Sequence, residues 1–305
     1  MSIAQDKSGT GPVAYIVMAL TPLFFSTNLI FGRGVSGDVA PFTLAFLRWL
    51  AVAIVLFPLL WQARTQIQAI STSGFGRICV LGFLGMWVCG ALVYVALDYT
   101  TATNATLIYT TSSVMIILIE FLFYGRKSNW REAVGIVMAM AGIVVIVVKG
   151  SLELLLSLTF NPGDLIILIS ALSWAVYSVL QRRGEVASIP TLPALALISA
   201  VGAVWLLPFA IWEFSSGQEM PETRHAWGSI AGIIVFASLL AFSGFQFGVR
   251  HLGAPVAGIF MYMLPVYGVA LAMIFLGERL EFYHLAGAAL VMGGIVSATL
   301  PMRLT

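Results

Sequence analysis

The sequence predicts an all-α integral membrane protein of ten transmembrane helices, arranged as two inverted five-helix repeats. Of its 305 residues, 60% are apolar and only 9% are charged, whereas soluble domains carry roughly 25% charged residues. A soluble fold could not bury so much apolar surface, so the surrounding solvent must be lipid. Two further patterns, the spacing of the apolar windows and an internal repeat, give the number and arrangement of the helices.

Charged and turn residues divide the chain into windows that are long enough to span a bilayer. A spanning helix needs about 20 mostly apolar residues. Ten windows meet this requirement, at 13–32, 40–61, 76–98, 101–124, 131–149, 164–182, 191–213, 227–249, 253–276 and 282–301. The first window is too long for a signal peptide and lacks a small-residue cleavage site, so we expect a retained membrane anchor.

A single shift of 152 residues aligns the two halves of the chain, pairing Pro41 with Pro193 and Gly125 with Gly277. Since each half holds five spans, the second copy should enter the membrane from the opposite side. Such inverted repeats are typical of secondary transporters, which bind substrate near the midplane and alternate its access; duplication for stability alone is the alternative. The expected domains are a tail, the first repeat, a linker, the second repeat and a second tail, at 1–12, 13–149, 150–163, 164–301 and 302–305.

The basic residues predict the orientation of the chain. Most Lys and Arg residues outside the spans fall in loops on the same side as the amino terminus. Basic loops stay in the cytoplasm, so both termini should be cytoplasmic.

Two charged residues lie well inside the predicted spans, where each is costly and requires a reason. Arg48 lies near the centre of the second window, where a charge costs about 2.5–3.5 kcal/mol on insertion scales. Its guanidinium could bind a substrate carboxylate, or it could bridge helices. Glu120 lies roughly 12 Å from the middle of the fourth window. It could couple transport to protons, or it could snorkel and pair with Arg126 or Lys127.

Uncharged polar and aromatic residues are concentrated in the first, third, fourth, sixth, eighth and ninth windows, which we expect to line a cavity. The candidates for contact with substrate are Ser26, Asn28, Trp87, Tyr94, Tyr109, Trp174, Tyr177, Ser178, Phe242, Gln246 and Tyr262. Hydroxyls and rings suit a compact amphipathic solute, whereas the phosphates of a sugar nucleotide would need more Lys or Arg. The alternative for each hydroxyl is a bond to its own helix backbone.

Two further patterns concern helix geometry and packing. Pro22 and Pro265 interrupt their windows and are candidates for hinges or for simple packing kinks. The fifth and tenth windows contain almost only Gly, Ala and aliphatic residues, which predicts that they pack together or against a neighbouring protomer.

Two segments resemble the drug/metabolite transporter superfamily, EamA type. Residues 264–280 read LPVYGVALAMIFLGERL and are similar to the family's last-but-one helix; residues 46–51 read FLRWLA and are similar to its second helix. The first repeat departs from the pattern, with Ser113 at the position of Pro265 and Arg126 at that of Glu278. The aromatic-rich spans look most like the bacterial YddG-type exporters of aromatic and other neutral amino acids.

This resemblance implies a transporter of the bacterial inner membrane that exports small amphipathic metabolites by alternating access. A proton-coupled antiporter of drugs or quaternary ammonium compounds is the alternative within the same superfamily.

Other classes of function fit the sequence less well. The three histidines fall at span ends or in loops, no Asp lies deep within a span, and no nucleotide-binding motif occurs, so we expect neither an enzyme nor a cofactor nor a metal site. The sequence contains no segment that resembles a selectivity loop, so we do not expect a channel. The net charge of +2 gives no footprint for nucleic acid. The expected partners are a small-molecule substrate and membrane lipid, and the oligomeric state stays open.

Overall fold

The structure is a computed structural model that describes residues 11–125, 130–151, 153, 161–181, 183–252 and 260–299. Within these ranges the chain is helical and contains no strand. In the first half the helices are α1 (Gly11–Gly34), α2 (Pro41–Val55), α3 (Phe57–Gln62), α4 (Arg64–Gln68), α5 (Thr72–Gly82), η1 (Phe83–Ala91), α6 (Leu92–Leu97), α7 (Ala102–Thr110), α8 (Ser112–Tyr124) and α9 (Trp130–Val147). In the second half they are α11 (Pro162–Gln181), η2 (Glu185–Ser188), α12 (Thr191–Ser215), α13 (Arg224–Gly232), η3 (Ile233–Leu240), α14 (Ala241–Leu252), η4 (Met261–Met263), α16 (Leu264–Leu276) and α17 (Phe282–Thr299).

Many of these helices have the length and composition of membrane spans. Within the described ranges, six helical segments are long and apolar enough to cross a bilayer, at Pro12–Gly34, Thr72–Leu97, Ala102–Tyr124, Pro162–Gln181, Thr191–Ser215 and Arg224–Phe245. Four more apolar helices are shorter, at Pro41–Val55, Ala133–Ile146, Leu264–Leu276 and Phe282–Gly294. The prediction of a helical, multi-pass membrane protein is therefore confirmed, while the count of ten spans stays a prediction.

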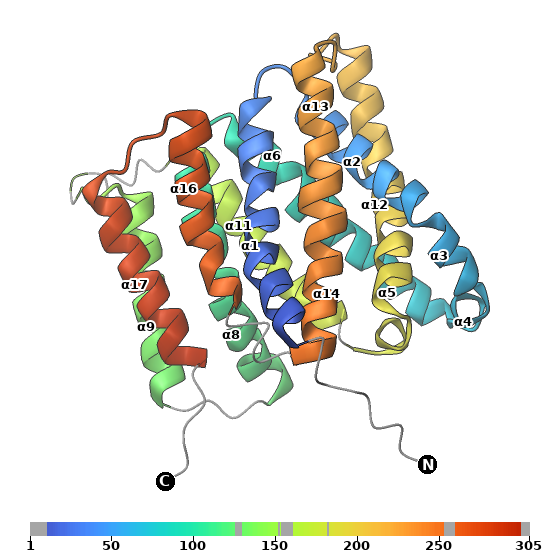
Figure 1. Ribbon diagram of the computed structural model, residues 1–305, viewed down its shortest axis with the longest axis horizontal. Coiled ribbons are helices and arrows are strands. Elements are labelled where there is room, and N and C mark those ends of the chain that lie inside the picture. Colours follow the sequence, from blue (N-terminus) through green and yellow to red (C-terminus); the bar gives the residue numbers. More distant parts are fainter. Residues whose placement is uncertain are drawn as a thin grey trace.

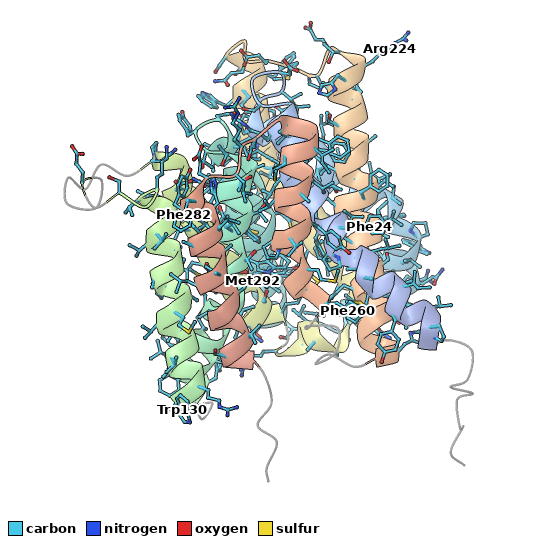
Figure 2. The ribbon with its side chains drawn as sticks, turned by 60° about the vertical axis from the view of Figure 1, so that its left-hand side comes forward. Phe24, Trp130, Arg224, Phe260, Phe282 and Met292 are labelled. Carbon is cyan, nitrogen blue, oxygen red and sulfur yellow. The ribbon has the colours of Figure 1, made fainter. Side chains whose placement is uncertain are left out.

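The helices stand roughly side by side, so the molecule has two ends (Figure 1). We call the end at which α1 begins and α17 finishes the near end, and the opposite end the far end. Trp130, the first residue of α9, lies at the near end, whereas Phe282, the first residue of α17, lies towards the far end (Figure 2). These two residues are related by the sequence shift, and their helices, α9 and α17, run in opposite directions.

Helices α9 and α17 pack closely along their length, as the sequence predicted from their small residues. A Cβ atom added to Gly142 of α9 would lie 2.8 Å from the carbonyl oxygen of Gly287 of α17. Only glycine permits so close a backbone approach, which is a common means of joining helices in lipid.

The other spans pack into two bundles, each of which takes its first helix from one half of the chain and the rest from the other half. Helix α1 packs against η3, α13, α14 and α16, and we call these helices the first bundle. Helix α11 packs against α5, η1, α6, α7 and α8, which form the second bundle. Helix α2 packs extensively on α12 beside them.

Two spans are broken at positions related by the same shift. Helix α8 begins at Ser112 and α16 begins at Leu264, and both end before a left-handed glycine, Gly125 and Gly277, each with φ of 65°. Position C′ of a helix favours glycine because this backbone conformation is strained for other residues.

The two breaks have different chemical causes. Pro265 has no N–H and follows the 3₁₀ turn η4, which explains the break before α16. The break before α8 contains no proline. There the hydroxyl of Thr111 donates to the carbonyl of Ile108 at 2.6 Å, and that of Thr110 donates to the carbonyl of Thr106 at 2.8 Å. Such side-chain bonds compete with the helix backbone and bend it.

Candidate functional site

Arg48 lies on α2 and is almost fully buried, with 5% of its surface exposed. Its Nε donates to the hydroxyl of Ser238 at 2.9 Å, and its Nη1 donates to Asn28 Oδ1 at 2.7 Å and to the Tyr94 hydroxyl oxygen at 3.0 Å. Tyr94 in turn donates to Asn28 Oδ1 at 2.9 Å. The guanidinium carbon also lies 4.3 Å from the centre of the Trp49 ring. We call Arg48, Asn28, Tyr94 and Ser238 the arginine network.

The described groups that bond to the positive charge of Arg48 are all neutral. Among the described residues, no carboxylate lies within ion-pair distance of Arg48, and its hydrogen-bond acceptors are an amide and two hydroxyls. Its Nη2 makes no hydrogen bond to any group that the structure describes. A buried guanidinium normally requires a paired charge and bonds to most of its donors, whereas the described hydrogen-bond partners of Arg48 are all neutral.

An aromatic cluster formed by Trp174, Tyr177, Tyr109 and Phe242 lies beside the arginine network. Trp174 stacks on Tyr177 with ring centres 5.2 Å apart, and its ring lies 6.5 Å from Tyr109 and 6.4 Å from Phe242. The Tyr109 hydroxyl contacts Cys89 Sγ at 2.6 Å, and η1, which carries Cys89, packs against α2, which carries Arg48. The centre of the protein therefore offers a cationic, polar region next to aromatic rings.

The segment η1 is a π-helix, which has wider turns than an α-helix, and it packs against both α2 and α11. At two glycines of η1, an aromatic ring from another helix packs directly against the backbone. A Cβ atom on Gly85 would lie 2.8 Å from the ring of Tyr177, and one on Gly90 would lie 2.8 Å from Nε1 of Trp49. Wide turns of this kind are often found at functional sites.

Several other predicted site residues have different surroundings. The Ser26 hydroxyl contacts the carbonyl oxygens of Pro22 at 2.9 Å and Leu264 at 3.0 Å, so it connects the proline-containing parts of α1 and α16. Helix α1 remains continuous through Pro22. Trp87 stacks with Phe83 at 5.1 Å and belongs to a second group of rings with Phe42 and Phe209.

The remaining candidates are Ser178, Glu120, Gln246 and Tyr262. Ser178 is half-buried on α11, and Glu120 is half-buried one turn before the end of α8. The side chains of Gln246 and Tyr262 lie outside the described part of the structure. A predicted cavity at the midplane is likewise not described. The structure instead shows an open hollow at the outer edge of the bundle, lined by Phe57, Pro58, Trp61 and Gln62.

Sequence reasoning missed a second buried polar network near the far end. The Asp164 carboxylate is fully buried and accepts hydrogen bonds from the Thr100 hydroxyl and from Asn104 Nδ2. Asn104 Oδ1 lies 2.9 Å from Nε2 of His284, whose Nδ1 accepts from the backbone N–H of Glu281 at 3.0 Å. These bonds assign the proton of neutral His284 to Nε2. The positions of Asp164 and His284 at helix starts hid them, because only charges deep within a span stand out in the sequence.

Comparison with known proteins assigns this helical membrane protein to the transporters. Residues 12–148 and 161–300 each match the EamA-like transporter family. The chain belongs to this family, and the match covers both halves.

Its relatives include an uncharacterized transporter of Archaeoglobus fulgidus, 28% identical over 93% of this chain and 96% of that protein. The uncharacterized transporter YetK of Bacillus subtilis is 27% identical over 92% of this chain and 85% of its own length. A solved structure described as "Crystal structure of protein" is 20% identical and has the same fold, with a TM-score of 0.62 over 96% of this chain and 99% of that one.

Proposed function

We propose that the protein is a secondary transporter that exports small amphipathic metabolites, aromatic and other neutral amino acids among them. The observation that carries this proposal is the buried guanidinium of Arg48, whose described hydrogen-bond partners are all neutral, beside the aromatic cluster. A guanidinium matches the geometry of a carboxylate, and the rings match the apolar side chain of such a substrate. A neutral amino acid presents both groups on one small molecule.

We further propose that transport proceeds by alternating access between two inverted five-helix repeats, residues 13–149 and 164–301. The opposite directions of the equivalent helices α9 and α17 support this arrangement (Figure 2), as do the equivalent breaks at Ser112 and Leu264. In such carriers the two halves interconvert around a central site.

The proposed orientation places both termini in the cytoplasm of a bacterium, with the protein in the inner membrane. A carboxyl-terminal alkaline phosphatase, which is active only outside the cytoplasm, should therefore stay inactive. Activity of this fusion would show that the orientation is reversed.

Counterflow in liposomes tests the proposed substrate class. Liposomes that contain the purified full chain are loaded with unlabelled tryptophan and offered labelled tryptophan, phenylalanine, methionine, threonine, a quaternary ammonium compound or a nucleotide sugar. We expect accumulation of the neutral amino acids without an imposed ion gradient, and none of the nucleotide sugar. If only the quaternary ammonium compound accumulates, and only under a pH gradient, the protein is instead an antiporter and Glu120 becomes the residue to study.

A further inference from the structure

The far end of the molecule holds several polar contacts between the two bundles. The guanidinium of Arg33, at the end of α1, donates to the carbonyl of Leu97 at the end of α6. Just beyond α1, the hydroxyl of Ser36 donates to the Asp98 carboxylate. A cation at the carboxyl end of a helix is favourable because of the helix dipole. Since α1 and α6 belong to different bundles, these contacts join the bundles at the far end.

Glu278 makes the most extensive of these contacts. It follows α16 of the first bundle, and its two carboxylate oxygens accept hydrogen bonds from the backbone N–H groups of Ala102 at 2.7 Å and Thr103 at 2.9 Å. Both N–H groups belong to the first turn of α7, in the second bundle. A carboxylate is especially stable there, because the first N–H groups of a helix have no partner within the helix and carry a partial positive charge.

The near end lacks comparable contacts between the bundles among the described residues. Helix α1 packs on α6, but the equivalent pair, α11 and α14, does not pack to a similar extent. None of the polar contacts described at the near end joins the two bundles: Glu185 accepts from Ser71, Arg183 lies over the ring of Tyr124, and His251 contacts the carbonyl of Phe247 within α14. The structure is therefore closed at the far end by bonds that cross between the bundles.

We infer that Glu278 is a gating residue, whose bond to the start of α7 holds the far end closed and must break each time that end opens. This inference rests on the alternating-access part of the proposed function. Among the described contacts that join the two bundles at the far end, only that of Glu278 uses both oxygens of a charged group and two backbone donors, while the Ser36–Asp98 bond is exposed to solvent. Exposed polar contacts stabilise little, so the closing energy should come mainly from Glu278, with two charge-assisted bonds, and from the single bond of Arg33 to Leu97.

The test measures access to the centre from each end. Cys89 lies in the centre, against Tyr109, and is a natural reporter. In a Cys79→Ser background, a membrane-impermeant methanethiosulfonate reagent is applied from one side of the membrane or the other, using vesicles of both orientations. In the protein with native Glu278, we expect labelling from the near end to be faster.

In the Glu278→Gln variant we expect labelling from the far end to rise roughly tenfold and labelling from the near end to fall. The amide keeps the shape of the side chain but loses the charge that strengthens both hydrogen bonds. The carrier cannot be open at both ends at once. Weakening the closure of the far end therefore increases the population that is open at the far end and decreases the population that is open at the near end, so the near-end rate falls.

The matched control is Glu281→Gln, in the same loop, where the side chain is exposed; labelling should match that of the parent. An equal rise from both ends would show general loosening and overturn the inference, as would no change from either end. Failure of amino-acid counterflow would overturn the proposed substrates but leave this result unaffected, because labelling requires no substrate.

Discussion

Replacement of Arg48 by methionine should separate recognition of a carboxylate from the stability of the protein. Methionine keeps the length and apolar stem of the side chain. The neighbours of Arg48 remain paired without it, because Tyr94 still donates to Asn28 at 2.9 Å and Ser238 still donates to the carbonyl of Ile233 at 3.2 Å. Replacing a buried charge by an apolar residue is often neutral when no partner is left unpaired, so we expect the free energy of unfolding to change by about 1 kcal/mol or less.

The effect on substrate should be larger and selective. A hydrogen bond to a charged group contributes about 1.5–3 kcal/mol, so loss of the guanidinium should raise the KM for tryptophan by about 10- to 150-fold. Tryptamine has the same ring but no carboxylate, so its KM should stay the same. Competition by each compound in the counterflow assay measures both values.

The control for this experiment is Arg64→Met, an exposed arginine on α4 that lies away from the arginine network. It should change neither KM. If the Arg48→Met variant folds and transports tryptophan normally, or if tryptophan and tryptamine weaken equally, then Arg48 does not bind the carboxylate and the proposed site is wrong.

Three further predictions concern stability. Glu213 is buried and accepts two backbone N–H bonds at the start of α2. Glu213→Gln should therefore lower the free energy of unfolding, measured by denaturation in detergent, by about 1–3 kcal/mol. An unchanged value would contradict this role. A Cβ atom on Gly202 would lie 2.3 Å from a side chain of η1, so Gly202→Ala should lower the free energy of unfolding by about 1–3 kcal/mol. Gly76 has open space around it, so Gly76→Ala should leave that free energy unchanged. Equal effects of the two substitutions would refute this prediction. Hydrogen bonds from Ser71 lower the pKa of Glu185, so its contribution is present above the unfolded pKa of about 4.3 and is lost as pH falls through the lower, folded pKa. The melting temperatures of wild type and Glu185→Gln should therefore differ at neutral pH and converge in acid; a constant difference would argue against this contact.

The sequence identified Arg48 but not its surroundings. A charge in the middle of an apolar window is conspicuous because of its insertion cost. Asn28 and Tyr94 were candidates as polar residues in neighbouring spans, yet nothing in the sequence pairs them with Arg48. Ser238 lies 190 residues from Arg48 along the chain, and only the packing of α2 against η3 brings the two together. Hydropathy gives depth in the membrane, but it does not give the direction in which a side chain points.

Helix irregularities were only partly predictable. Pro265 lacks an N–H, so its effect on the helix can be read from the residue itself. The equivalent break at Ser112 depends on threonine hydroxyls that compete with the backbone, and most threonines in helices cause no such break. The π-helices η1 and η3 pack against aromatic rings of distant helices, such as Tyr177 against Gly85 and Phe24 against Phe236, and a local sequence pattern does not show these contacts.

Single polar or aromatic residues at membrane depth could not be assigned to the site from the sequence either. Ser26 and Trp87 looked alike in sequence to residues of the central site, since all lie at membrane depth. In the structure Ser26 bonds to backbone carbonyls and Trp87 packs among the rings of Phe83, Phe42 and Phe209. Whether either residue contacts substrate stays a prediction, whereas the resemblance to the EamA family is confirmed by the match over both halves.

The arginine network also has an electrical consequence. Arg48 is positive, and no described carboxylate neutralises it. A zwitterionic amino acid adds no net charge, so this positive charge is present in the loaded and the empty carrier alike. A membrane voltage of 100 mV acts on one charge with about 2.3 kcal/mol over a full crossing of the membrane. If α2 changes its depth in that field during a transport step, the free energy of the step changes by a fraction of this value. The rate of transport then depends on voltage even though the substrate is neutral.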